Sequence, residues 1–213
     1  MDRLPVFVRQ HIAAFRTLLV FTVLCGLIYP FVMVGVSQLV FHNHANGSMV
    51  SYNGHVVGSS LLCQEFSDAR GNPLPQYFQP RPSAAVNPSD KTDYGCDPGY
   101  SAASNLGPSN PTLVQQIKQR QQQIAAFDHV PVSQIPPDAV TASGSGLDPN
   151  ISPQNAAIQV NRVATARHLP VSTVKELVAK FTQGRPLGFL GEPRVNVLNL
   201  NIALDQLSAK SGD

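Results

Sequence analysis

The run Ser143-Gly144-Ser145-Gly146 carries hydroxyl groups in a small-residue loop, the kind of setting in which a nucleophilic serine works. A hydrolase would need a histidine base and a carboxylate beside it, for which His168 and Asp148 are candidates. Neither serine has glycines two residues away on both sides, which is the pattern of a nucleophile elbow. Because a triad is defined by geometry and not by spacing, the sequence assigns no catalytic residue and keeps a hydrolase as an alternative.

The same loop leads into a predicted helix, with Ser152 as N-cap and Pro153 at the first helical position. Exposed N–H groups and the helix dipole make such ends anion sites. The run lacks the Lys-Ser/Thr ending of a P-loop and the strand context of a dinucleotide fold, so a structural glycine turn is the alternative. The weak nucleotide or anion candidates are Ser143, Gly144, Ser145, Gly146, Asp148 and Ser152.

Histidines offer the other candidate chemistry. His42 and His44 stand one residue apart, and His55 follows a short way on. Neutral imidazoles are common zinc ligands, but no carboxylate or thiolate accompanies these residues at suitable spacing, and the chain has no CxxC motif. The sequence therefore predicts no metal site, and surface histidines near a membrane account for the pair.

An uncharged apolar run from Thr17 to Val40 must position everything else. As a helix it would be roughly 36 Å long, enough to cross a hydrocarbon core of ~30 Å with some tilt. Arg3, Arg9 and Arg16 precede it, whereas no Lys or Arg follows before Arg70. The positive side stays inside, so we expect three parts: a cytoplasmic lead (1–16), a single transmembrane helix in lipid (17–40) and an extracytoplasmic domain (41–213).

A cleavable signal peptide, with Gly35 and Ser37 as its small-x-small pattern, is disfavoured because the apolar run exceeds the usual length of about 7–15 residues. Pro30 removes a backbone donor and predicts a bend unless neighbouring groups re-pair the freed carbonyl. Small residues let a second helix approach closely in lipid. The candidates for such a transmembrane contact are Cys25, Gly26, Pro30 and Gly35.

Composition narrows the class of protein. Lys+Arg number 15 against 13 Asp+Glu, so the charge gives no nucleic-acid footprint, and charged residues make up only 13% of the chain. Such a low charge favours a partly covered surface outside the membrane. Cys63 and Cys96 would lie in an oxidising compartment, where a disulfide between them is permitted, although the sequence does not reveal its geometry.

The pattern predicts an α+β fold: one N-terminal transmembrane helix, then a compact domain with a β-hairpin or small sheet and about three to four helices. Asn53-Gly54 between two β-prone runs predicts the hairpin. Thr173 and Glu176 have capping-box spacing at the start of the third helix. The expected elements are a hairpin (48–57), a long structured loop (71–111), helices (111–127, 153–168 and 172–184), a strand (195–198) and a terminal helix (202–207).

An ordered set of short motifs runs through almost the whole chain. The motifs are Tyr29-Pro30, Gly58-Ser59-x-Leu61, Gln64-x-Phe66, Tyr77-Phe78-x-x-Arg81-Pro82-Ser83-Ala84, Ser104-Asn105-Leu106, Ser109-Asn110-Pro111, Val140-Thr141-Ala142-Ser143-Gly144-Ser145-Gly146-Leu147-Asp148, Ile151-Ser152-Pro153, Arg162-Val163-Ala164-x-Ala166-Arg167 and Val195-Asn196-Val197-x-x-Leu200-Asn201. In this order they resemble the C subunit of the Kdp-type potassium-transporting ATPase, the KdpC family. The segment 85–99 departs from the shared pattern.

The resemblance implies a non-catalytic accessory subunit of an inner-membrane complex that imports potassium with ATP. Its partners would be a potassium-translocating, channel-like subunit and a P-type ATPase subunit. The family is also described as a catalytic chaperone that raises ATP affinity, with ATP as an implied ligand. The predicted topology separates the outer domain from cytosolic ATP, so we expect no firmly bound cofactor. A membrane-anchored extracytoplasmic hydrolase of envelope material is the alternative function.

Overall fold

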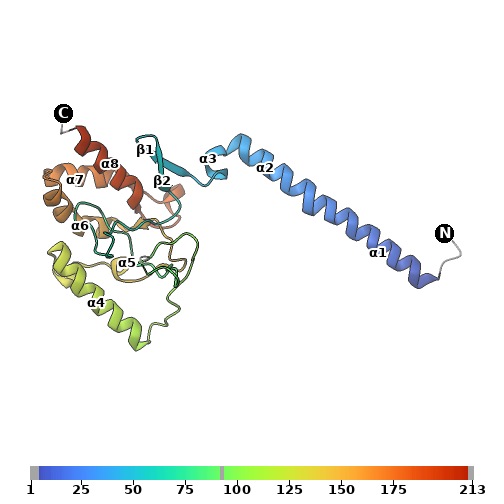
Figure 1. Cartoon of the computed structure of the whole chain (residues 1–213), viewed down its shortest axis with the longest axis horizontal. Helices are drawn as coiled ribbons and strands as arrows, with labels where there is room; N and C mark the ends of the chain where they lie inside the picture. The colour runs from blue at the N-terminus through green and yellow to red at the C-terminus, as the bar shows by residue number, and fades with distance from the viewer. Residues whose placement is uncertain (1–4, 92–93, 211–213) are drawn as a thin grey trace. The chain divides into compact units, whose positions relative to one another are not determined.

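The computed structural model describes residues 5–91 and 94–210 and divides the chain into two compact units, Met1–Met49 and Val50–Asp213 (Figure 1). Arg3, which contributes to the orientation argument, lies outside the described residues, as do residues 92–93 of the segment 85–99. The first is called the N-terminal unit and the second the C-terminal domain.

The N-terminal unit is dominated by one long helix. It comprises α1 (Val6–Val23), a π-helical segment (Leu24–Ile28) and α2 (Tyr29–Val40), which Figure 1 shows as a continuous rod. Over Val6–Val40 it is apolar and long enough to cross a membrane, and none of its most apolar window is buried. A short helix, α3 (His42–Ala45), follows.

The π-helical segment explains how Pro30 is tolerated inside this helix. Proline has no N–H to give to the carbonyl four residues earlier. The backbone widens just before it, and Tyr29 N donates to Leu24 O, five residues back. Local π geometry is one way in which a helix re-pairs groups next to a proline, so a widened turn stands where the sequence predicted a bend.

The C-terminal domain begins with the predicted hairpin, formed by β1 (Met49–Tyr52) and β2 (His55–Ser59). Asn53 and Gly54 both have positive φ angles, of 50° and 81°. Two successive left-handed residues are what a two-residue type I′ turn requires, and Asn-Gly adopts them at little cost. The hairpin prediction is confirmed.

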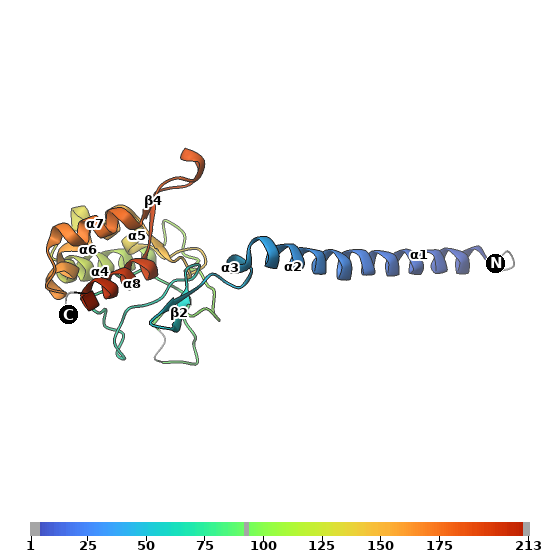
Figure 2. The ribbon, with the colours of Figure 1, turned by 90° about the horizontal axis from the view of Figure 1, so that it is seen from above.

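Four longer helices follow: α4 (Pro111–Asp128), α6 (Pro153–Ala166), α7 (Val171–Phe181) and α8 (Val197–Lys210). The predicted caps of the first two are confirmed, because the side chain of Asn110 accepts from Thr112 N and that of Ser152 from Asn155 N. Helix α7 packs against α6 and α8, and α4 packs against α6 (Figure 2). Single helical turns lie at 132–134, α5 (Pro137–Val140) and 186–188.

The third helix was expected to start near Ser172 or Thr173 and to stop by Gly184, and its bounds lie close to these, but its predicted capping box is absent. Helix α7 begins at Val171 directly after Pro170, and no side chain caps it, so the capping box of Thr173 and Glu176 does not form. Pro170 already has the extended backbone of an N-cap residue, which places Thr173 inside the first turn. The helix stops at Phe181, before Gly184, because residues 182–183 pair as a strand.

A second sheet joins distant parts of the chain. Strand β5 (Arg194–Asn196) lies between β3 (Asn150–Ile151) and β4 (Thr182–Gln183), and both pairings are antiparallel. The predicted strand over 195–198 was too long and the predicted helix over 202–207 too short. The cause is Asn196, whose Oδ1 accepts from Asn199 N at 3.0 Å and thereby starts α8 at once.

The core lies between α6, α7, α8 and β5. Its fully buried members include Val160, Val163, Val174, Val195, Leu200 and Leu204. Phe78, from the long loop after residue 71, is also fully buried there. The loop is therefore anchored by this aromatic residue, whereas Tyr94 and Tyr100 are exposed.

Candidate functional site

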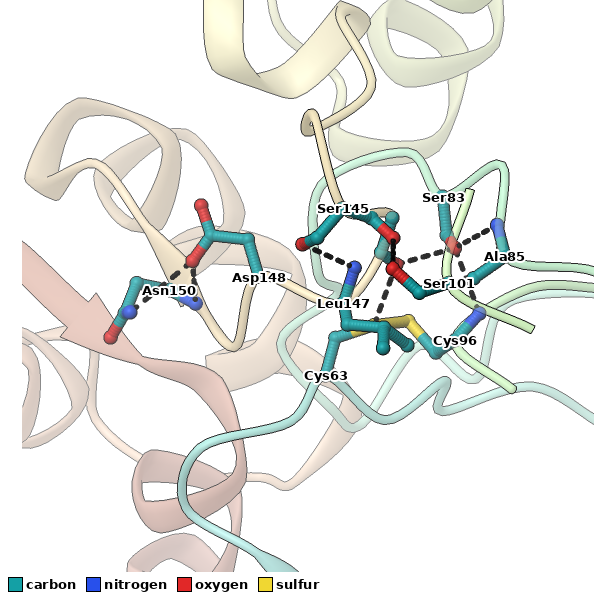
Figure 3. Close-up of a disulfide and its surroundings, with 10 residues drawn as sticks. Cys63, Ser83, Ala85, Cys96, Ser101, Ser145, Leu147, Asp148 and Asn150 are labelled. Atoms are coloured by element: carbon teal, nitrogen blue, oxygen red, sulfur yellow. Dashed lines mark hydrogen bonds between the residues drawn. A yellow bond between two sulfur atoms is a disulfide. The ribbon is translucent and has the colours of Figure 1, made fainter. Parts of the chain in front are cut away.

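The predicted Gly-Ser-Gly loop lies beside a disulfide that joins Cys63 to Cys96 (Figure 3). The S–S distance is 2.04 Å, the Cα atoms are 5.4 Å apart, and 33 positions separate the two residues in sequence. Cys63 N donates to Leu147 O at 3.0 Å, so one end of the bridge is bonded directly to the loop. The pairing that composition only permitted is present.

Ser83 connects three segments at this place. Its Oγ donates to Gly146 O at 2.7 Å and accepts from Ala85 N at 3.0 Å and from Cys96 N at 2.9 Å (Figure 3). A hydroxyl with these three bonds has little capacity left for a ligand. Ser83 belongs to a motif that the sequence singled out, but its role as a junction was not predicted.

The two loop serines also serve the fold. Ser145 Oγ accepts from Leu147 N at 3.1 Å, and Ser145 O accepts from Ser101 Oγ and Ala102 N at 3.0 and 2.9 Å. Ser143 is buried, with no hydrogen-bond partner for its Oγ. Within the described residues, no hydrogen bond joins either serine to a histidine. The loop around Ser143 and Ser145 is therefore a turn that hydrogen bonds from several segments hold in place.

Gly146 is the residue this turn requires. Its φ is +72°, and a Cβ there would lie 2.5 Å from Ala102 O and 2.8 Å from Ala85 N. We expect Gly146→Ala to lower the free energy of unfolding by about 1–3 kcal/mol from backbone strain alone. Gly144→Ala is the matched control, because a Cβ there meets nothing within 4 Å. Thermal denaturation of both variants checks this; equal stability would contradict it.

The N-terminus of α6 already holds an anion from the chain itself. The Asp138 carboxylate accepts from Ser152 N and Ser152 Oγ, both at 2.8 Å, and from Asn155 Nδ2 at 3.1 Å. Asp148, the other carboxylate of the loop, pairs with Arg81 at 3.0 Å. The position that a phosphate would take at this helix end is thus occupied by Asp138. No local pattern revealed this, because Asp138 and Ser152 are 14 residues apart.

A buried ion pair links α6 to the end of α4. Arg162 Nε donates to Asp128 Oδ1 at 2.7 Å, and both side chains are only 5% exposed. The Arg162 guanidinium also stacks on the Phe127 ring at 4.3 Å. Burial disfavours charge, so it raises the pKa of Asp128 and lowers the pKa of Arg162. Each charge is therefore tolerated in the interior only through its partner.

The arginines of α6 also hold the loop that carries Phe78. Arg162 Nη1 donates to Pro75 O at 2.6 Å and to Tyr77 O at 2.8 Å. Arg167 Nε donates to Gln76 O at 2.6 Å, and its Nη2 pairs with Asp205 of α8 at 2.7 Å. The backbone carbonyls of three successive loop residues, 75–77, therefore each accept a hydrogen bond from Arg162 or Arg167.

Two side-chain amides each form a pair of hydrogen bonds with one backbone residue of this loop, as a neighbouring strand would. Asn201 Oδ1 accepts from Phe78 N and its Nδ2 donates to Phe78 O, both at 2.9 Å. Gln159 Oε1 accepts from Gln79 N at 2.7 Å, and its Nε2 donates to Gln79 O at 3.2 Å. We call Asn201 and Gln159 the amide clamps. In the sequence, the only hint of these two clamps is that each is a polar residue on an otherwise apolar helix face.

The histidines considered for chemistry lie at the ends of helices, in α3 and at the start of β2. His129 caps the end of α4 and His168 follows α6, with φ of 55° and 56°, so both serve as left-handed helix terminators. His42 and His44 belong to α3, and His55 begins β2. Within residues 5–91 and 94–210, no group of three or more His, Cys, Asp or Glu side chains gathers as a metal site would require.

One cavity of about 330 Å³ opens between α4 and the proline-rich loop. Arg81, Arg120, Tyr94 and Phe127 are among its lining residues. Arg120 Nη1 donates to Val140 O at 2.9 Å, and burial lowers the pKa of this arginine. The lining therefore combines cations and aromatic rings with amides, serine hydroxyls and carboxylates.

The transmembrane candidates occupy the widened part of the long helix and the turn after it. Cys25 and Gly26 lie in the π-helical segment, and Pro30 and Gly35 lie in α2. Cys25 is a free, exposed thiol, and a Cβ added at Gly35 would meet no atom within 4 Å.

Comparison with known proteins places the sequence in a family. The family model described as KdpC, the K+-transporting ATPase c chain, matches residues 11–206. The chain belongs to the KdpC family. Similar relatives called potassium-transporting ATPase KdpC subunit come from Beijerinckia indica (48% identity, 92% of this chain and 93% of the relative) and Methylococcus capsulatus (46%, 91% and 96%). A third comes from Gemmatimonas aurantiaca (51% identity, 87% of each chain).

KdpC membership bears directly on the alternatives. The matched relatives are named as subunits of an ATPase, and the comparisons give no support to the envelope hydrolase. The match also covers the polar junctions described above, from Ser83 to the amide clamps. These groups bond to other parts of the C-terminal domain and form its internal framework.

Proposed function

We propose that this KdpC chain is a non-catalytic accessory subunit of an ATP-driven potassium import complex, where it stabilises the assembly and supports the ATPase subunit. The observation that carries the proposal is the family match over residues 11–206, together with relatives named as potassium-transporting ATPase subunits. Its partners would be the channel-like subunit that carries potassium and the P-type ATPase subunit.

The geometry supports a scaffolding role. In the candidate loop, Ser145 Oγ accepts from Leu147 N and Asp148 pairs with Arg81, and Asp138 accepts from Ser152 at the N-terminus of α6. The long helix exposes its apolar surface in the isolated chain, as a helix that contacts lipid or other membrane helices would. We assign Cys25, Gly26, Pro30 and Gly35 to a helix contact with a partner subunit.

The proposal includes a location. Arg9 and Arg16 lie in the first half of the long helix, and no Lys or Arg follows before Arg70. By the positive-inside rule the N-terminus is cytoplasmic, and residues 41–213 lie on the outer face of the inner membrane. Cytosolic ATP is then separated from the domain by the bilayer, so the subunit affects ATP use only through its membrane partners.

Protease treatment of sealed, right-side-out vesicles tests both location and mechanism. With tags at both ends of the full chain in its complex, we expect protease to remove the C-terminal tag and spare the N-terminal tag. Inverted vesicles from the same cells are the control and should show the reverse. A C-terminal domain protected in right-side-out vesicles would overturn the topology and return direct nucleotide binding to consideration.

A further inference from the structure

The cavity of about 330 Å³ beside α4 has the size of a small-molecule site, for which the usual range is about 300–1,000 Å³. Four lining residues stand at positions i, i+3, i+4 and i+7 of α4, namely Arg120, Gln123, Ile124 and Phe127. Side chains at this spacing lie on one face of a helix. One face of α4 therefore forms a wall of the cavity.

A second wall, the proline-rich loop, is mainly apolar. Pro80 and Pro82 line the cavity and have no backbone N–H to offer a ligand. The side-chain amide of Gln79 already donates to nearby backbone carbonyls at 3.0 Å. Tyr94 adds an aromatic ring that lies against Gly71, where a Cβ would come within 2.6 Å of a ring atom. A ligand would meet rings and hydrocarbon on this side.

Two charged residues of the lining are neutralised within the domain. Arg81 pairs with Asp148 at 3.0 Å and also donates to Thr141 O at 3.3 Å. Asp128 pairs with Arg162 at 2.7 Å. Neither Arg81 nor Asp128 therefore needs a charged ligand.

Arg120 differs from both. Its Nη1 donates to Val140 O at 2.9 Å, whereas its Nε and Nη2 have no partner among the described residues. No described carboxylate forms an ion pair with it, and this includes Glu65, which also lines the cavity. Burial lowers the pKa of Arg120, and no neighbouring carboxylate offsets that shift. A half-buried cation without a counter-ion is unfavourable, and an anion in the cavity would relieve this.

We propose that the cavity binds a small organic carboxylate with a flat apolar body. Nε and Nη2 of Arg120 present two parallel N–H groups, which is the fork that pairs with a carboxylate. Gln123 makes no side-chain hydrogen bond within the described part of the chain, so its amide is available to the same group. The apolar body of the ligand lies against Ile124, Phe127 and the proline-rich loop. This site goes beyond the proposed subunit role and does not depend on it.

Other classes of ligand fit the cavity less well. A cation would meet the unpaired charge of Arg120. A phosphate group takes several donors at once, often backbone N–H groups, but Arg81 is committed to Asp148 and the prolines lack N–H. A neutral apolar molecule would bury Arg120 further without pairing it. A singly charged carboxylate matches the one cation that is left over.

The test is a titration of the full chain in detergent with benzoate, benzamide and benzamidinium, which share one ring and differ in charge. We expect saturable benzoate binding with a dissociation constant on the order of 1 mM, as suits so small a ligand. Benzamide should bind about tenfold more weakly or worse, and benzamidinium should not saturate. Isothermal titration calorimetry measures all three, with detergent alone as the blank.

Variants locate the binding. Arg120→Gln should weaken benzoate about tenfold or more, to the level of benzamide. Arg185→Gln is the matched control, because it removes an arginine that is exposed, paired with Glu192 and outside the cavity lining, so benzoate affinity should not change. Ile124→Trp keeps the cation but fills the space, so it should also weaken benzoate. Circular dichroism shows whether each variant is folded.

Several results would overturn the assignment. Equal affinity for the three probes would mean apolar binding without a role for the cation. Preference for benzamidinium would show that carboxylates, and not Arg120, dominate the cavity. Wild-type benzoate affinity in Arg120→Gln or in Ile124→Trp would place the binding elsewhere. If Arg120→Gln does not fold, the three probes on the wild type and the Ile124→Trp variant still decide.

Discussion

Arg162→Met should lower the free energy of unfolding by about 3–5 kcal/mol, because it leaves the Asp128 carboxylate buried without its cation. Both side chains are 5% exposed and joined at 2.7 Å, so water cannot replace the lost partner. The change also removes Arg162 Nη1, which donates hydrogen bonds to Pro75 O and Tyr77 O. Urea denaturation of the full chain in detergent, followed by near-ultraviolet circular dichroism, measures the effect.

Arg185→Met is the matched control. Its ion pair with Glu192 has a similar distance, 2.6 Å, but the side chains are 46% and 79% exposed. Exposed pairs contribute about 0–1 kcal/mol, so this variant should be nearly as stable as the wild type. Adding Asp128→Leu to Arg162→Met should restore part of the loss, because the unpaired charge is gone. Equal losses for the two arginine variants would contradict a buried-charge mechanism.

Removing the disulfide through Cys63→Ser with Cys96→Ser should cost about 3–4 kcal/mol, because the unfolded chain regains the freedom of a closed loop. The bridge spans 33 positions, and the N–H groups of its two cysteines donate to Leu147 O and to Ser83 Oγ, next to the turn at Gly146. We expect the 141–148 loop to show faster amide hydrogen exchange than the core helices.

Reductant provides an independent arm of the same test. It should lower the melting temperature of the wild type and leave the double serine variant unchanged. Cys25→Ser is the control, since Cys25 is a free thiol in the long helix and should not alter either result. A wild-type melting temperature that does not respond to full reduction would show that the bridge does not stabilise the domain.

Local signals predicted much of the fold. Asn53-Gly54 identified the hairpin, and Asn110-Pro111 and Ser152-Pro153 identified the starts of two helices, because turns and caps depend on adjacent residues. The boundary at residue 196 was missed because alternating Val195 and Val197 look like a strand. Only the hydrogen bond from Asn199 N to Asn196 Oδ1 shows that a helix has begun.

The candidate site was predicted less well, for a physical reason. Its key contacts join residues far apart, such as Ser83 with Gly146 and Asp138 with Ser152. A carboxylate or hydroxyl carries no sequence mark that tells which distant backbone group it will bind. The two-residue strands β3 and β4 are too short to show alternation, so the second sheet was also invisible.

The amide clamps impose an order on folding. Phe78, the largest fully buried side chain, is held by Asn201, which lies 123 positions further along the chain. A nascent chain that ends before α8 lacks Asn201 and also lacks Leu200 and Leu204, which belong to the same core cluster as Phe78. Contacts of such long range form only after their late partner exists, so the domain closes when its last helix has been made. We therefore expect the synthesis of α8, and not the emergence of each earlier helix, to decide when this subunit is ready to assemble.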